Sequence, residues 1–499
     1  MMRLCMRPLA AVGLLCLAFA SAGANPASPS GAGETAQAPS DAQIVAKVDE
    51  YMRAAVEFDQ FTGSILVARN GTPIISKGYG RANYEWDVPN TSDTVFQIAS
   101  LTKQFTATAI MQLQEQGKLK VGDPVCNYVD DCPPAWRPIT LRHLLTHTSG
   151  IKNFSSLPGW DEDLGRRTYR RAELVDLFRD LPLEFAPGEK YKYSNSGYVL
   201  LGLVIERASG KSYGKFLHDG IFAPLGMART AFDDNRTLIS GRAAGYYSRG
   251  TDFVFSPYNL DPTTQFAAAG VTTTTRDLLV WDQALYTEKL LSQKSLDEMF
   301  TPFKNNYGYG WQTGEKLGRR KLDHSGSNDG FSSYMIRFPD DRVTVIVLSN
   351  SDRTSAGKAG TNLASIVFGA PYKLPEPQLR DLLWQTIVEK GAEAGIRQYR
   401  ELKRTEPKKH DFGDETLIDL GYDLLDSKRI AEAAAIFRFN LEMFPRSAYS
   451  YDGFADIAIE QGDKKKAAAY FEKSLSIDPD NDYASEALDR LQRGNMRRR

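Results

Sequence analysis

Three short motifs, in a fixed order along the chain, contain side chains suited to acyl transfer. Ser100-Leu101-Thr102-Lys103 comes first, Tyr193-Ser194-Asn195 follows, and His324-Ser325-Gly326 comes last. Together they supply a hydroxyl nucleophile and two groups, an amine and a phenol, that can move its proton. Each motif is short enough to occur by chance, so their order carries the prediction of a serine nucleophile.

The surroundings of Ser100 separate it from other Ser-x-x-Lys matches, such as those that begin at Ser212 and Ser355. Ser100 follows a strand-like run, residues 95–99, and opens a predicted helix that extends to about residue 117. At a helix start, free amides and the positive end of the helix dipole stabilise negative charge. Lys103 lies one turn later on the same face, so its amine can reach the Ser100 hydroxyl. The alternative is that Ser100 only caps the helix.

Tyr193 and Asn195 form the one Tyr-x-Asn match in the chain. A phenol is a poor base at its usual pKa near 10, but nearby cations favour the phenolate. If Lys103 and His324 converge on Tyr193, we expect the phenolate to accept the Ser100 proton and pass it to the leaving group. Asn195 would then bind a substrate amide. The alternative is a loop tyrosine that only packs its ring.

His324 ends a predicted strand and is followed by Ser325, Gly326 and Ser327. A glycine here would let a substrate backbone lie against the sheet edge. The Ser327 amide would face a developing oxyanion. We therefore expect this segment to bind substrate.

The three motifs, with Leu144-Leu145-Thr146-His147-Thr148-Ser149-Gly150 between the first two, resemble the serine β-lactamase-related family over roughly residues 45–370. That family includes class C β-lactamases, DD-carboxypeptidases, D-aminopeptidases and some carboxylesterases. The resemblance implies that Ser100 is the acylated nucleophile and that Lys103 and Tyr193 transfer protons. It also implies that the Ser100 and Ser327 amides form the oxyanion hole.

The third motif departs from the class C pattern, which usually has Lys-Thr-Gly where this chain has His324-Ser325-Gly326. A neutral histidine binds a carboxylate less well than a permanent ammonium does. We therefore expect an exported hydrolase of D-amino-acid peptides or small esters and amides. The alternatives are a genuine β-lactamase, or an inactive penicillin-binding-like scaffold.

Metal, cofactor and nucleic-acid functions have little support in the sequence. His143 and His147 are one helical turn apart, a spacing that can bind zinc, but no third ligand is evident. We expect no cofactor and no metal. The chain has 499 residues, a formal net charge of -1 and no basic folded segment, which argues against a nucleic-acid surface.

The N-terminal region predicts export. Residues 1–24 have the basic start, apolar stretch and small residues of a cleaved signal peptide, and the stretch is too short to span a membrane. Residues 25–43 are rich in Ala, Pro, Ser and Gly and predict a disordered leader. We expect a periplasmic or secreted protein without a stable membrane span. In such a compartment Cys126 and Cys132 would form a disulfide.

The hydrolase domain is predicted to span residues 44–372 as an α+β fold, an antiparallel sheet flanked by helices with a helical subdomain. Asn70-Gly71 predicts the turn of a first hairpin. Late strands are predicted at residues 307–311, 320–324, 332–338 and 343–348. Strands at both ends of a helical insert predict a sheet in which the two ends of the domain pair.

An α-helical repeat domain is predicted after this fold, over residues 411–493, with a helical connector at 376–410. Several positions recur at one constant spacing, among them Ala433, Phe437, Leu441 and Pro445, which become Ala467, Phe471, Leu475 and Pro479. The pattern resembles the tetratricopeptide repeat of about 34 residues, whose proteins stack paired helices. Such a module either binds a protein partner or only braces the fold. The partners expected are thus a small-molecule or peptide substrate and, through the repeats, a protein.

Overall fold

The computed structural model describes residues 39–157, 159–160, 163–234, 236–249, 252–255 and 260–492. The predicted signal peptide and most of the predicted leader lie outside these residues. The first helix, α1 (Asp41–Glu57), begins inside the range that the sequence assigned to the leader. Ser40 caps it in a reciprocal capping box with Gln43, a local signal that outweighs the loop-like composition before it.

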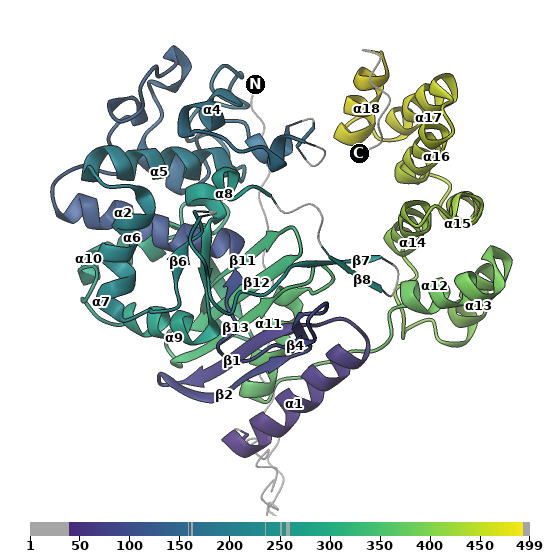
Figure 1. The fold of residues 1–499 in the computed structure, drawn as a ribbon, viewed down its shortest axis with the longest axis horizontal. Helices are drawn as coiled ribbons and strands as arrows, with labels where there is room; N and C mark the ends of the chain where they lie inside the picture. Colours follow the sequence, from purple (N-terminus) through teal and green to yellow (C-terminus); the bar gives the residue numbers. More distant parts are fainter. Residues whose placement is uncertain are drawn as a thin grey trace, which may run out of the picture. The chain divides into compact units, whose positions relative to one another are not determined.

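A six-stranded sheet lies at the centre of the hydrolase domain (Figure 1), in the order β10-β11-β12-β13-β1-β2. Every neighbouring pair is antiparallel. The first strand of the domain therefore pairs with the last, which confirms the predicted closure of the sheet by the two ends of the domain. The strands are β1 (Gly63–Arg69), β2 (Thr72–Tyr79), β10 (Gln312–Lys316), β11 (Arg319–Asn328), β12 (Phe331–Phe338) and β13 (Val343–Ser349).

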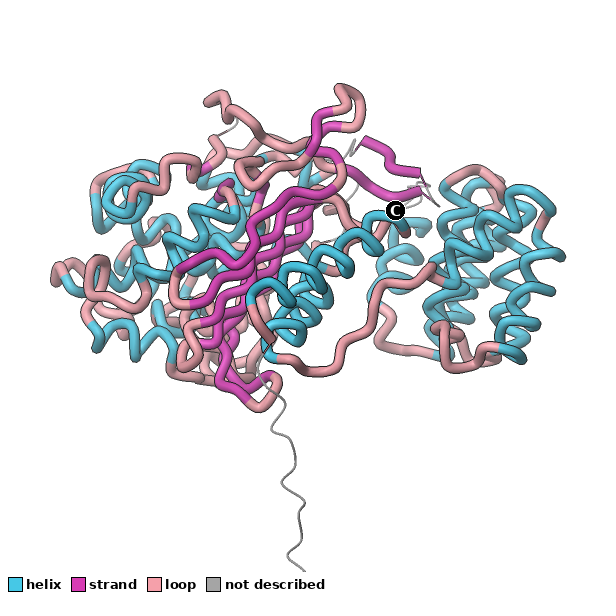
Figure 2. The backbone as a smooth tube through the Cα atoms, turned by 90° about the horizontal axis from the view of Figure 1, so that it is seen from below, coloured by secondary structure: helices cyan, strands magenta, loops and turns pink. Residues whose placement is uncertain are grey.

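Both faces of the central strands of this sheet are buried, and helices lie on both sides of the sheet (Figure 2). Ile65 and Val345 pack with α1 and α11 (Ala356–Phe368) on one side. Leu66 and Ile346, one residue further along each strand, belong to the core on the other side. Because successive side chains of a strand point to opposite faces, the near-continuous apolar runs of β1 and β13 supply both cores.

The turn between β1 and β2 follows the sequence prediction. Asn70 and Gly71 have φ of 52° and 75°, the left-handed conformations that a two-residue hairpin turn of this kind requires. Glycine and asparagine adopt this conformation more readily than other residues, so the turn residues set the register of the hairpin.

The predicted strand at residues 307–311 is wrong. The segment makes only an isolated bridge from Tyr307 to Gln312, and the strand β10 starts where the predicted one ends. Gly310 has φ of 75°, and a Cβ atom there would lie 2.7 Å from the Lys103 carbonyl oxygen. The alternation of aromatic and glycine residues thus reflects a tight turn packed against the Lys103 backbone. The same alternation is typical of a strand, so the sequence pattern alone does not distinguish the two.

Helices and short strands fill the region between the two parts of the sheet. Three small antiparallel sheets pair β3 with β4, β9 with both β5 and β6, and β7 with β8. Their strands are β3 (Arg81–Asn83), β4 (Val88–Pro89), β5 (Phe96–Gln97), β6 (Ala231–Phe232), β7 (Tyr246–Arg249), β8 (Asp252–Phe255) and β9 (Val271–Thr273). The main helices are α2 (Thr102–Glu115), α3 (Leu141–Leu145), α4 (Arg171–Asp176), α5 (Asn195–Ser209), α6 (Tyr213–Leu217), α8 (Pro262–Ala269), α9 (Thr275–Ala284) and α10 (Gln293–Phe300).

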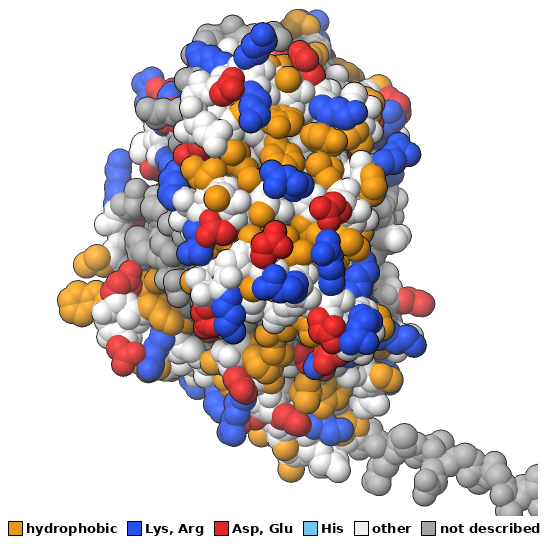
Figure 3. All heavy atoms as spheres, turned by 90° about the vertical axis from the view of Figure 1, so that its right-hand side faces the viewer, with side chains coloured by type: hydrophobic (Ala, Val, Ile, Leu, Met, Phe, Trp, Pro, Cys, Tyr) orange, Lys and Arg blue, Asp and Glu red, His pale blue; other side chains and the backbone are white. Residues whose placement is uncertain are grey.

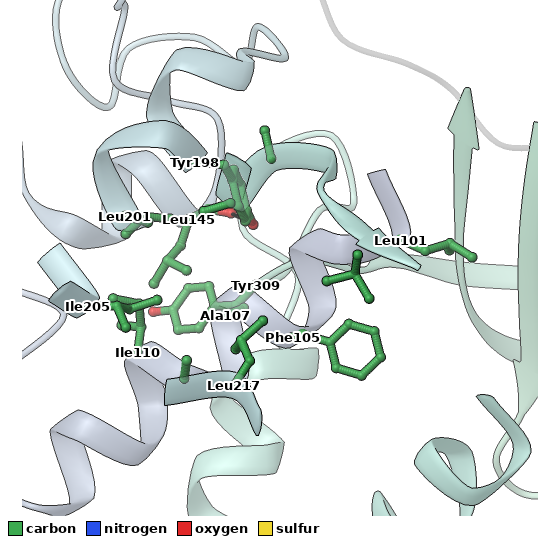
Figure 4. Packing of buried hydrophobic residues seen from close by; sticks show 14 of the residues in the cluster. Leu101, Phe105, Ala107, Ile110, Leu145, Tyr198, Leu201, Ile205, Leu217 and Tyr309 are labelled. Carbon is green, nitrogen blue, oxygen red and sulfur yellow. Dashed lines mark hydrogen bonds between the residues drawn. The ribbon is translucent and has the colours of Figure 1, made fainter. Parts of the chain in front are cut away.

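The helix α2 runs through the middle of the larger core, with buried side chains all around its first three turns. Figure 4 shows Phe105 and Ile110 of this helix among residues of α5 and α6, including Leu201, Ile205 and Leu217. A helix buried on all sides has little freedom to move. The start of α2, which carries Lys103 and directly follows the turn with Ser100, is therefore held rigidly.

Cys126 and Cys132 are joined by a disulfide, with their Cα atoms 5.3 Å apart. The bridge closes the loop between η2 (Val125–Asn127) and η3 (Pro134–Trp136). Val125 and Trp136, at the two ends of this loop, are buried in the larger core. The disulfide therefore ties together a surface loop whose ends are already anchored.

The C-terminal part of the described chain is entirely helical. The pair α14 (Asp414–Asp426) and α15 (Ile430–Met443) is followed by the pair α16 (Ala448–Glu460) and α17 (Lys464–Ile477). Each helix of the second pair begins and ends the same number of residues after its counterpart in the first pair. A further helix, α18 (Asp482–Gln492), starts after α16 by that interval again, while α12 (Leu379–Lys390) and α13 (Ala392–Thr405) precede the first pair. The helix bounds thus repeat with the period predicted from the sequence.

The Phe437 ring of α15 packs closely against the two helices on either side of it in the sequence, α14 and α16. Phe437 is fully buried, and Cβ atoms added to Gly421 or Gly453 would lie 2.4 Å from its ring. These glycines let neighbouring helices approach the ring, as small residues in stacked helical repeats do.

A hydrogen bond in these helices occurs twice with its partners exchanged. Asn440 donates to Ser447, and at the equivalent positions of the next copy Asn481 donates to Ser474. The two positions thus keep one amide and one hydroxyl in each copy.

The surface of the molecule has no single-sign charged region on the face drawn in Figure 3, where lysines and arginines are interspersed with aspartates and glutamates. Within the described residues, every helix is too short or too polar to cross a membrane.

Candidate active site

Ser100 lies in η1 (Ala99–Leu101), a single tight turn between β5 and α2. It is half-buried, whereas Leu101 and Thr102 after it are fully buried. Ala99 has φ of 47°, an unusual conformation for an alanine that costs about 1–3 kcal/mol and persists only where the surroundings enforce it. The strained turn therefore presents the Ser100 hydroxyl at the start of a rigid helix.

The Lys103 amine contacts three oxygen atoms in a fully buried position. Its Nζ lies 3.0 Å from Ser100 Oγ, 2.9 Å from Asn195 Oδ1 and 2.9 Å from the carbonyl oxygen of Ala268. Two of these oxygens are carbonyl acceptors. A neutral amine would use its two hydrogens on them and direct its lone pair at the Ser100 hydroxyl.

Burial lowers the pKa of Lys103 well below its usual value of 10.5. The amine makes no ion pair with the carboxylates of the described residues. The rings of Tyr193 and Tyr198, 4.8 Å and 5.3 Å from Nζ, favour the cation only modestly. The surroundings of Lys103 therefore shift it towards the form that can accept a proton.

Tyr193 donates its phenol hydrogen to Ser100 Oγ over 2.9 Å. Burial raises the pKa of Tyr193 above its usual value of 10, and the hydrogen bond to Ser100 offsets only part of that rise. The phenol therefore keeps its proton in the resting site, contrary to the expectation that nearby cations would favour the phenolate. Sequence reasoning missed this because burial, rather than the nearest charge, dominates.

Asn195 is the first residue of α5, and its side chain is anchored on both sides. Its Oδ1 accepts from Lys103, and its Nδ2 donates to Ser155 Oγ over 3.0 Å. Its backbone amide donates to Asn153 Oδ1 over 3.0 Å. Asn195 thus orients the Lys103 amine in this structure, and no motif in the sequence pointed to Asn153 or Ser155.

His324 is buried on β11 and makes two hydrogen bonds that define its tautomer. Its Nδ1 lies 2.6 Å from the Ser325 carbonyl oxygen and must donate to it. Its Nε2 lies 2.8 Å from the Tyr307 hydroxyl and accepts from it. Burial, aided by Lys103, lowers the pKa of His324 to about 3, so the imidazole is neutral at physiological pH.

Gly326 is required by the chain itself, because a Cβ atom there would lie 2.4 Å from the Ile98 carbonyl oxygen and 2.9 Å from the Ser100 amide nitrogen. The expected reason for this glycine was contact with a substrate backbone. Instead, the turn that carries Ser100 passes directly over it, and Ser333 Oγ donates to Ile98 O to hold that turn in place.

The last residues of β11 lie beyond the end of β10, whose register stops at Asp323. Ser325 and Ser327 are exposed there, while Gly326 between them is buried. On the inner side, Ser327 pairs with Ser332 of β12. This half of β11 is therefore a short open edge beside Ser100, where an extended substrate can add as a strand.

The side chains at the far end of this edge are neutral amides. Asn328 donates to Gln265 Oε1 over 2.9 Å and to Gln97 Oε1 over 3.5 Å. Gln97 lies three residues before Ser100. Amide side chains offer donors and acceptors but no charge, so this part of the site suits a neutral ligand group.

His143 and His147, whose spacing can bind zinc, each use a ring nitrogen in a hydrogen bond to the backbone. No group of three or more His, Cys, Asp or Glu side chains in the described part of the chain is arranged to hold a metal ion. His143 Nδ1 accepts from the Thr140 amide at the start of α3, and His147 Nδ1 accepts from the Ser194 amide. Each imidazole is therefore committed to a backbone donor.

Ser212 lies in the pattern Gly210-Lys211-Ser212-Tyr213-Gly214, which matches the nucleophile elbow of α/β-hydrolases. The elbow chemistry requires a serine between a strand and a helix. Here Ser212 lies between the helices α5 and α6, so the match has no structural support.

The fold and the Ser100–Lys103–Tyr193 arrangement define a serine hydrolase of the β-lactamase and penicillin-binding type. A family model described as Beta-lactamase matches residues 48–368. The chain is 34% identical over 345 residues to Penicillin-binding protein 4* of Bacillus subtilis, covering 64% of this chain and 75% of that protein. The chain belongs to the beta-lactamase family.

Solved structures show the same similarity. The octameric penicillin-binding protein homologue from Pyrococcus abyssi has a TM-score of 0.60 and 29% identity, covering 69% of this chain and 82% of that one. The D-amino acid amidase from Ochrobactrum anthropi SV3, in complex with L-phenylalanine amide, has a TM-score of 0.57 and 28% identity, covering 65% and 97%. Both likenesses cover about two thirds of this chain.

Proposed function

We propose that this chain is an exported serine hydrolase that cleaves amides, peptides or small esters of D-amino acids through an acyl-enzyme on Ser100. The observation that carries the proposal is the placement of Lys103 and Tyr193 on the two sides of Ser100 Oγ, at 3.0 Å and 2.9 Å. These are hydrogen-bonding distances at which protons transfer directly.

In the proposed acylation step, the lone pair of Lys103 accepts the Ser100 hydroxyl proton as Oγ bonds to the substrate carbonyl carbon. The amides of Ser100 and Ser327 stabilise the oxyanion that forms. Tyr193 then donates its proton to the leaving amine or alkoxide as the scissile bond breaks, and it regains a proton from the Lys103 ammonium. A proton held by a buried phenol is thus available where the leaving group needs it.

In the proposed deacylation step, water attacks the acyl carbon while the Lys103 amine takes the proton of that water. The proton returns to Ser100 Oγ when the ester bond breaks. The resting arrangement of hydrogen bonds is thereby restored.

The substrate preference follows from the neutral surroundings of the open edge of β11. His324 is uncharged, and Gln97, Gln265 and Asn328 carry no charge. A substrate with a free carboxylate would lack a permanent cation to pair with at His324, whereas an amide or ester group is accommodated by amide donors and acceptors. The likeness to a D-amino acid amidase supports the same preference.

The test compares turnover of D-phenylalanine amide, L-phenylalanine amide, p-nitrophenyl acetate, a D-Ala-D-Ala peptide and nitrocefin, with Ser100→Ala as the control. We expect the D-amide or the ester to exceed the carboxylate-bearing D-Ala-D-Ala peptide and nitrocefin. Dominant turnover of nitrocefin would favour a β-lactamase. An absence of turnover, together with no labelling by a fluorophosphonate, would favour a non-catalytic scaffold.

Export and the repeat module are parts of the same proposal. The predicted signal peptide implies a periplasmic or secreted protein, which N-terminal sequencing of the mature chain checks by a start near residue 25. The constant period of the helix bounds supports a tetratricopeptide-like module at α14–α18. Asn440→Ser should weaken that module, because the Asn440 amide donates to Ser447, Ser450 and Asp414. Asn440→Ser with Ser447→Asn should restore it in part, since this exchange reproduces the Ser474–Asn481 pair of the next copy.

The module is also proposed to bind a protein partner. Co-purification of a partner with the full chain that is lost in Asn440→Ser and regained in the double variant would support this role. Unchanged co-purification in both variants would leave the module only as a brace.

A further inference from the structure

We infer that His147 is a positioning residue that holds Tyr193 against Ser100. His147 follows α3, is buried, and has φ of 55°, a left-handed conformation that few residues other than glycine and asparagine adopt readily. The inference rests on the proposed role of Tyr193 as the proton donor.

The backbone around Tyr193 is hydrogen-bonded to His147 on both sides. The Lys192 amide donates to the His147 carbonyl oxygen over 2.9 Å. The Ser194 amide donates to His147 Nδ1 over 3.2 Å. A single residue thereby fixes the positions directly before and after Tyr193, and the left-handed backbone of His147 lets its carbonyl and its ring face the same segment.

The imidazole also forms part of the wall behind the phenol. Its centroid lies 4.2 Å from that of the Tyr193 ring, with 34° between the planes, and 4.7 Å from that of Tyr307. Tyr307 in turn donates to His324. The imidazole thus packs against both tyrosines, the one that serves Ser100 and the one that serves His324.

The protonation state of His147 suits this role. Because Nδ1 accepts a backbone hydrogen, the proton of the neutral ring must be on Nε2. Burial, with contributions from Lys103 and His324, lowers the pKa of His147 well below 6.5 and keeps the ring neutral. The Nε2 atom is buried without a hydrogen-bond partner in the described structure. Because the ring lone pair on Nδ1 accepts from the Ser194 amide, His147 does not act as the base for Ser100.

Two substitutions at His147 separate positioning from general structural support. Asparagine places an acceptor oxygen where Nδ1 lies and tolerates a left-handed backbone, whereas glutamine reaches the Nε2 position and fits this backbone less well. We expect Ser100 of the His147→Asn variant to be acylated at a rate within about threefold of the wild-type rate. We expect His147→Gln to lower kcat by roughly ten- to hundredfold with a smaller change in KM, because misplacement of a catalytic group by about 1 Å has effects of this size.

A double-mutant comparison checks that the effect passes through Tyr193. His147→Gln should add little to the loss caused by Tyr193→Phe, because a phenol that is absent cannot be misplaced. Fully multiplicative losses, or a loss in His147→Asn equal to that in His147→Gln, would overturn the inference. His218→Gln, a substitution of an exposed histidine, serves as the control and should leave the rate unchanged.

Amide hydrogen exchange gives a readout that does not depend on turnover. The Ser194 amide should exchange faster in His147→Gln than in the wild type, and at nearly the wild-type rate in His147→Asn. Equal protection in all three proteins would contradict the inference. If the wild-type chain cleaves none of the substrates, the proposed function fails, and the exchange result still decides whether His147 positions this segment.

Discussion

Replacing His324 by glutamine should make the hydrolase domain less sensitive to acid. The unfolded chain binds a proton at His324 below its usual pKa of 6.5, whereas the buried imidazole of the folded chain remains neutral down to a pKa of about 3. The folded state has the lower pKa, so the contribution of the neutral imidazole to the stability is fully present above pH 6.5. This contribution is lost as the pH falls towards 3. Each pH unit in this window costs about 1.4 kcal/mol.

From about pH 7 to about pH 4.5, the contribution of His324 to the free energy of unfolding should therefore fall by about 2.7 kcal/mol. Glutamine does not titrate, and it can place an oxygen where Nε2 accepts from the Tyr307 hydroxyl. His324→Gln should thus lose about 2.7 kcal/mol less than the wild type over this range, whatever its stability at neutral pH.

The assay is urea unfolding of both proteins at the two pH values, followed by tryptophan fluorescence. Five of the six tryptophans lie in the hydrolase domain, so the signal reports mainly on that domain. His218→Gln removes an exposed histidine and should follow the wild type. Parallel losses in the wild type and His324→Gln would refute the assignment of His324 as a buried neutral imidazole.

Three further predictions concern the base, the disulfide and the repeats. Lys103→Ala should lower the acylation rate by about 10²- to 10⁴-fold, measured by stopped-flow with a chromogenic ester, and a wild-type-like rate would exclude Lys103 as the base. Cys132→Ser should lower the free energy of unfolding by about 2 kcal/mol, because the loop is short, and reductant should then have no further effect. Phe437→Ala should destabilise the C-terminal helices by about 3–5 kcal/mol in thermal unfolding but leave the rate of Ser100 acylation unchanged.

Local sequence signals predicted those parts of the fold that depend on neighbouring residues. Asn70-Gly71 determined the hairpin because only certain residues adopt positive φ readily, and the repeat period anticipated the helix bounds of α14 to α17. The spacing of Ser100 and Lys103 also predicted their contact, since one helical turn separates them.

Features that depend on distant contacts could not be read from the sequence. The turn at Gly310 resembles a strand until the Lys103 backbone is placed beside it. The proton on Tyr193 is retained because the fold buries the phenol, although the cationic groups expected around it suggest the opposite. The residue type of Ala268 does not indicate its contact with Lys103, because Ala268 accepts from that amine through its backbone carbonyl oxygen.

The most direct test of the account is the site of the acyl group. The chain is mixed with a slowly hydrolysed D-amino acid ester, quenched in acid and digested with trypsin, which releases the peptide of residues 82–103. We predict one acyl group on this peptide, assigned to Ser100 by fragmentation, and none in Ser100→Ala. An acyl group on another residue, or undiminished turnover by Ser100→Ala, would contradict the central claim.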